Sequence, residues 1–127
     1  MRFRRSVGVA FLCCAITALA LAWSSSVSTS QVSETKRFCN QIKKLSGPVP
    51  RSYVGSAKHI RDANKLVSEA PRGVRADVKA WRDYIRDHVS PDDPASQDIE
   101  NFPRAIQTAI SRIRSFTEQK CGLDPKT

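Results

Sequence analysis

Tyr84 and His88 are the residues in this sequence whose types and spacing most readily suggest chemistry. They stand four positions apart, so on a helix the phenol and the imidazole lie on one face. Tyrosinate and imidazole both ligate haem iron. His59, the other histidine of the chain, would add a ligand if its helix turned the same way. The spacing predicts a candidate haem-ligand site. The simpler interpretation is a half-buried tyrosine beside a solvated histidine at a helix end.

A second group of residues carries positive charge at helical spacing. If two of the helices expected below are neighbours, eight cations share one side of the protein. They are Lys58, Arg61, Lys65, Arg72, Arg75, Lys79, Arg82 and Arg86. Such a surface attracts polyanions, which for an exported protein means anionic lipid headgroups or phosphate polymers of the cell envelope. Interleaved aspartates favour an ordinary solvated face instead, and the lack of alternating aromatic residues makes nucleic acid the less expected partner.

The sequence offers little for catalysis or for metal binding. It has no Cys-x-x-Cys, no phosphate-cradling glycine loop and no serine-elbow motif. The acidic segment 92–100 lacks the alternating acids, central glycine and terminal glutamate of a calcium-binding loop, so we interpret it as a solvated capping loop. These features predict a non-catalytic binding or structural module with no metal site.

The first residues of the chain have the features of an export signal. Three arginines precede an apolar run that ends in Ala20-Leu21-Ala22, a sequence suited to signal cleavage. The run, of about 16 residues, is shorter than the roughly 20 that a membrane-spanning helix needs. We therefore expect a cleavable signal peptide over residues 1–22, with residue 30 as the latest cleavage position. A secreted, periplasmic or cell-envelope location follows, and a membrane tether through an uncleaved signal anchor is the alternative.

Removing the signal peptide changes both the charge and the cysteine count. The full chain has 21 basic and 12 acidic residues, a formal charge of +9, and loss of Arg2, Arg4 and Arg5 leaves +6. Cys13 and Cys14 lie inside the apolar run behind bulky side chains, which argues against lipidation. The remaining two cysteines, Cys39 and Cys121, form an even pair, which in an exported chain predicts one disulfide.

Apolar residues recur at helical spacing in four segments that prolines and glycines separate. The expected order is a flexible polar leader over 23–33, helices over 33–45, 52–69, 71–89 and 103–121, and a tail over 123–127. Pro71 and Pro103 are expected at the first helical positions, with Asn101 close enough to cap the last helix. The helix over 71–89 is central, because Trp81 lies in the middle of its apolar stripe.

Four amphipathic segments with short links predict an all-α fold, an antiparallel four-helix bundle over residues 34–122. In that topology Cys39, early in the first helix, and Cys121, at the end of the fourth, lie at the same end. One disulfide would therefore close the bundle. We expect no transmembrane segment in the mature part of the chain.

Two resemblances accompany these residues. Residues 83–88 are similar to the Tyr-x-x-x-His motif of small secreted helical haemophore-type proteins of mycobacteria, which implies a haem-binding carrier. Residues 38–122 resemble small exported helical proteins of actinobacterial type, with an early Phe-Cys, a central Ala-Pro-x-x-Val-Arg-x-Asp-Val motif and a late Cys-Gly. Gly73 departs from that motif, since an acidic residue is usual there. The second resemblance implies export and a helical fold but supplies no activity; the partner would be an anionic envelope component or another exported protein.

Overall fold

The computed structural model describes residues 29–123, which are entirely helical apart from their connections. The four α-helices are α1 (Thr29–Leu45), α2 (Ala57–Glu69), α3 (Arg72–His88) and α4 (Arg104–Cys121). No strand occurs within the described range. The expectation of an all-α fold with four helices is therefore confirmed. The predicted signal peptide, most of the predicted leader and the end of the predicted tail lie outside the described residues.

The C-terminal end of α1 agrees with the prediction from the sequence, and its start does not. The helix begins at Thr29, four residues before the expected start at Ser33, so the polar leader is helical over its last residues. It ends where expected, because the prolines after Gly47 cannot continue a helix. The N–H of Ser46 still donates to the carbonyl of Ile42 at 2.8 Å and completes the last turn.

The expected start of α2 at Ser52 is wrong, since residues 51–55 form turns and the helix begins at Ala57. Gly55 has a φ of +81°, which breaks the helical path, and a Cβ there would lie 2.6 Å from the carbonyl oxygen of Val89. Ser56 then caps the helix by accepting the N–H of His59. The residues buried on α2 are His59, Ala63 and Leu66, which form its inward face.

Two prolines stand just before helices rather than within them. Pro71 and Pro103 have extended ψ angles of 154° and 144°, and each is the N-cap of the helix that follows it. The connection before α4 contains two short 3₁₀ turns, Pro94–Gln97 and Ile99–Asn101. Asn101 does not cap α4, because its side-chain amide donates to the carbonyl of Ala95 at 3.2 Å.

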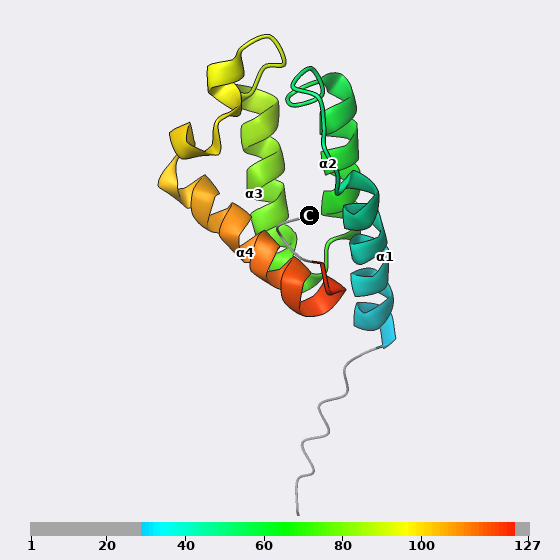
Figure 1. The fold of residues 1–127 in the computed structure, drawn as a ribbon. Coiled ribbons are helices and arrows are strands. Elements are labelled where there is room, and N and C mark those ends of the chain that lie inside the picture. Colours follow the sequence, from blue (N-terminus) through cyan, green and yellow to red (C-terminus); the bar gives the residue numbers. More distant parts are fainter. Residues whose placement is uncertain (1–28, 124–127) are drawn as a thin grey trace, which may run out of the picture.

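The helices pack in a cycle in which α1 contacts α2, α2 contacts α3, α3 contacts α4, and α4 returns to α1. Figure 1 shows α2 and α3 side by side, with α4 running obliquely across α3. Two clusters of buried side chains hold this arrangement. The first is Phe38, Leu66, Ala70, Val74 and Val78, and the second is Ile85, Val89 and Phe102. Trp81 is half-buried and packs against both clusters, so it joins the two halves of the core.

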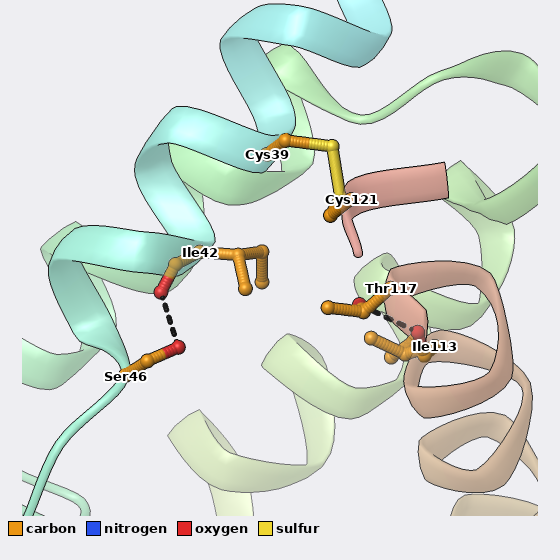
Figure 2. The surroundings of a disulfide bond; sticks show 6 residues. All are labelled: Cys39, Ile42, Ser46, Ile113, Thr117 and Cys121. Carbon is orange, nitrogen blue, oxygen red and sulfur yellow. Dashed lines mark hydrogen bonds between the residues drawn. A yellow bond between two sulfur atoms is a disulfide. The ribbon is translucent and has the colours of Figure 1, made fainter. Parts of the chain in front are cut away.

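A disulfide joins the first helix to the last. The sulfur atoms of Cys39 and Cys121 lie 2.01 Å apart and their Cα atoms 5.3 Å apart, which agrees with the pairing expected from the sequence (Figure 2). Gly122 follows with a φ of +63°, the left-handed conformation that commonly ends a helix. The cross-link therefore closes the cycle of helices at the end of α4.

Candidate functional site

An apolar cleft of about 580 Å³ opens between α1 and α4 and reaches inward to α2 and α3. Its walls come from all four helices and from the connections on either side of them. The apolar lining side chains are Phe38, Ile42, Leu45, Val49, Leu66, Val78, Trp81, Ile99, Ile110, Ile113 and Leu123. The volume falls within the roughly 300–1,000 Å³ that is usual for small-molecule sites.

The hydroxyl groups at the cleft are already hydrogen-bonded within their own helices. Ser46 donates to the carbonyl of Ile42 at 2.8 Å, and Thr117 donates to the carbonyl of Ile113 at 2.8 Å. Figure 2 shows the side chains of Ile42 and Thr117 pointing toward one another across the space below the disulfide. These hydroxyls do not need a polar ligand, so the chemistry of the walls favours an apolar one.

The rim of the cleft supplies both apolar and charged groups. Val49 and Ile99 are 49% and 48% exposed, and with Val32 they are the large apolar side chains that the described surface exposes most. Both line the cleft, so an apolar entrance leads to an apolar interior. Arg114 and Glu118, one helical turn apart on α4, are the charged side chains that line the cleft.

The predicted pair Tyr84 and His88 lies elsewhere on α3. The two rings are in contact, with centroids 4.8 Å apart, and the ring of Tyr84 also packs on Phe102 at 4.7 Å. Tyr84 is half-buried and His88 is exposed. Neither residue lines the apolar cleft.

His59, the third residue of that prediction, has a different environment. Its imidazole lies between Tyr53, at 4.7 Å, and Trp81, at 5.5 Å between ring centroids. Its Nδ1 accepts the backbone N–H of Gly55 at 3.0 Å, so the ring stabilises the turn that precedes α2. Burial lowers the pKa of His59 below its ordinary value of 6.5, with the nearby carboxylate of Asp62 opposing that shift. The structure shows no contact of His59 with Tyr84 or His88.

The environment of His59 predicts a stability that falls on mild acidification. The neutral ring accepts a hydrogen bond at Nδ1, whereas a protonated ring would present a donor to the N–H of Gly55. Because its folded-state pKa is depressed, the contribution is fully present above pH of about 6.5 and is lost as the pH falls through the lower folded-state pKa. Urea unfolding at several values between pH 7.5 and 5 measures this decline, in a range above the titration of most carboxylates.

Two variants identify the group responsible for that decline. His59→Gln should be less stable at pH 7.5 but show a flatter profile down to pH 5. The exposed His88 offers the matched control, since His88→Gln should keep the slope of the parent protein. A parent profile that is flat over this range would contradict the prediction, and so would a slope that His88→Gln abolishes.

Carboxylates lie beside most of the cations of the predicted basic face. Five of its eight cations lie within 4 Å of an acidic side chain. The pairs are Lys58–Asp62, Arg75–Glu34, Lys79–Asp83, Arg82–Asp83 and Arg86 with both Asp83 and Asp87. The hydrogen bond from Lys79 contributes most to holding the pKa of Asp83 below its usual range. Arg61, Lys65 and Arg72 have no acidic partner within the described range, so this face is less positive than the count of cations suggests.

The sequence does not predict the apolar cleft. Apolar residues at helical spacing fit a filled core equally well, and nothing in the sequence indicates that the space lined by Ile42, Ile110 and Ile113 stays open. Among residues 29–123 no group of three or more His, Cys, Asp or Glu side chains is placed to hold a metal ion. None of the described helices is long and apolar enough to cross a membrane.

Comparison with known proteins does not indicate a function for the cleft. No family model, curated protein or solved structure matches the chain.

Proposed function

We propose that this protein is an exported, non-catalytic binding module that carries a small apolar ligand, such as a fatty acyl chain, in the cleft between α1 and α4. The observation that carries the proposal is the continuity of apolar side chains from the exposed Val49 and Ile99 to the buried Phe38 and Val78. Burying an apolar chain against these walls releases roughly 25 cal/mol for each Å² removed from water. Arg114 at the rim suits a carboxylate at the end of such a chain.

Export belongs to the same proposal. The arginines at the start of the chain, the apolar run and Ala20-Leu21-Ala22 support a cleaved signal peptide. A disulfide between Cys39 and Cys121 suits an oxidising compartment outside the cytosol. Within this proposal the four helices act as an antiparallel bundle whose first and last members are held together by this disulfide.

Trp81 provides the readout, because it lines the cleft. The protein recovered after export, carrying Trp23→Phe so that Trp81 is the sole tryptophan, is titrated with monomeric palmitate. We expect a saturable change in emission that corresponds to one ligand per chain. Thr117→Phe should fill the cleft and weaken binding at least about tenfold, a loss of about 1.4 kcal/mol.

Thr108 offers the matched control on the same helix. Like Thr117, it donates to the carbonyl four residues earlier, at 2.9 Å, but it is exposed and does not line the cleft. Thr108→Phe should therefore bind palmitate as the parent does. If palmitate leaves the emission of Trp81 unchanged, or if both threonine variants bind like the parent, the cleft is not the ligand site.

Haem binding through Tyr84 and His88 is the alternative function. Both rings lie on one face of α3 and are in contact, which keeps the two candidate ligands adjacent. A haemin titration followed at the Soret band separates the alternatives. Haem carriage requires a Soret shift that Tyr84→Phe and His88→Gln remove, whereas Thr117→Phe should leave such a shift intact.

A further inference from the structure

A second groove, of about 780 Å³, is lined by α1, the start of α3 and the end of α4 next to the disulfide. It shares no lining residue with the apolar cleft. Four cations line it, namely Lys36, Lys43, Arg72 and Lys120. Lys36 and Lys43 lie about two turns apart on α1, and the fold brings Arg72 of α3 and Lys120 of α4 to the same groove. Only Arg72 belongs to the basic face predicted from the sequence.

The charge in this groove is not compensated within residues 29–123. No aspartate or glutamate of this range lines the groove. The cations along α2 and α3 contrast with this, because Lys79 and Arg86 lie 2.8 and 2.7 Å from carboxylates. None of the four groove cations has an acidic partner within 4 Å in the described part of the chain. Cations gathered in a concave surface create a positive potential that attracts and holds anions.

The start of α3 adds donors to the same groove. Pro71 makes no side-chain capping bond, and the first turn of α3 contains no acidic residue. The N–H of Val74 already donates to the carbonyl of Pro71 at 3.0 Å, whereas the N–H groups of Arg72 and Gly73 have no acceptor within the described residues and favour an anion together with the helix dipole. Gly73 also lines the groove, and a Cβ there would meet no atom within 4 Å, so the groove is open at this position.

From these features we propose that the groove between α1, the start of α3 and the end of α4 binds a phosphate-bearing anion. A phosphate group carries at least one negative charge and presents several acceptor oxygens, which suits three lysines and one arginine better than a carboxylate with two oxygens does. Val32, which is 58% exposed, lines the same groove and places an apolar group beside the cations. The source is either a free phosphate compound or a phospholipid headgroup. The site is separate from the apolar cleft and does not depend on a ligand there.

The test measures binding to both sources with charge-matched variants. Pyrophosphate is titrated into the exported protein by calorimetry, and sedimentation measures binding to vesicles of phosphatidylglycerol or of phosphatidylcholine. The groove variant is Lys36→Gln with Lys120→Gln, and the control is Arg61→Gln with Lys65→Gln, which removes the same charge from α2. All four side chains belong to exposed residues, so both variants should fold.

We expect the groove variant to weaken binding at least about tenfold and the control less than about twofold, equivalent to about 1.4 and 0.4 kcal/mol. Binding of pyrophosphate indicates a free phosphate ligand. Binding only to phosphatidylglycerol vesicles indicates a lipid headgroup, and either result supports the site. Equal losses in the two variants would reduce the effect to net charge and overturn the proposal. It is also overturned if neither pyrophosphate nor phosphatidylglycerol binds, or if phosphatidylcholine vesicles bind equally well.

Discussion

Replacing both Cys39 and Cys121 with serine should lower the free energy of unfolding by about 4 kcal/mol. The two cysteines are 82 positions apart and join the first helix to the last, so the bond constrains almost the whole described chain in the unfolded state. The chain-entropy account gives about 4–5 kcal/mol for a loop of this length, as an upper figure. Small domains have only about 5–15 kcal/mol of stability in total, so the loss would leave much of the protein unfolded at elevated temperature.

Urea unfolding of the parent and of the double variant measures this difference. Cys39 is buried, and a serine hydroxyl there would add a desolvation cost of its own. The double alanine variant controls for that cost, and the parent protein reduced with dithiothreitol controls for substitution as such. All three forms should lose comparable stability. A loss within about 0.5 kcal/mol, the usual scatter of surface substitutions, would mean that α1 and α4 stay together without the bond.

The features that the sequence predicted well depend on neighbouring residues or on a simple count of residue types. Proline and glycine fix where helices end, as after Leu45, and the even pair of cysteines indicated the bridge. The start of α2 failed for the opposite reason. Gly55 needs its positive φ because the turn approaches the carbonyl of Val89, more than thirty positions later, and no local pattern reveals that contact.

The two candidate sites were missed because each depends on distances between helices. An apolar stripe shows that a residue such as Ile113 avoids water, but it does not show whether the facing helix fills the space. The cleft lies between α1 and α4, and α4 runs obliquely across α3 (Figure 1). The basic groove has the same origin, since Lys36, Arg72 and Lys120 become neighbours only when three helices meet.

Charge pairing is only partly predictable from the sequence. The pairs Lys58–Asp62 and Lys79–Asp83 have the spacing of one helical turn, and interleaved aspartates in the sequence already suggested a solvated face. Only the structure shows which cations within residues 29–123 have no carboxylate nearby. The cations that the sequence places on one basic face are therefore partly neutralised, whereas the four cations of the groove lie on three helices and have no acidic partner within residues 29–123.

Truncation of Phe38 to alanine should cost about 3–5 kcal/mol of stability, the range for a fully buried aromatic ring. Its side chain is 0% exposed and packs in the larger core cluster with Val74 and Val78. These three are the largest fully buried side chains among the described residues. Trp81 is larger but only half-buried at the cleft. Trp81→Ala should therefore lower the free energy of unfolding by about 2–3 kcal/mol, less than the loss expected for a fully buried ring.

Phe116 supplies the companion measurement, because its ring meets that of Phe38 edge to face, with centroids 5.8 Å apart and an interplanar angle of 74°. Phe116 is only half-buried, so Phe116→Ala alone should cost about 2 kcal/mol. The double variant should show a coupling of about 0.5–1.5 kcal/mol between the rings. If Phe38→Ala costs no more than Phe116→Ala and the two losses simply add, α1 does not dock on α4 through these rings.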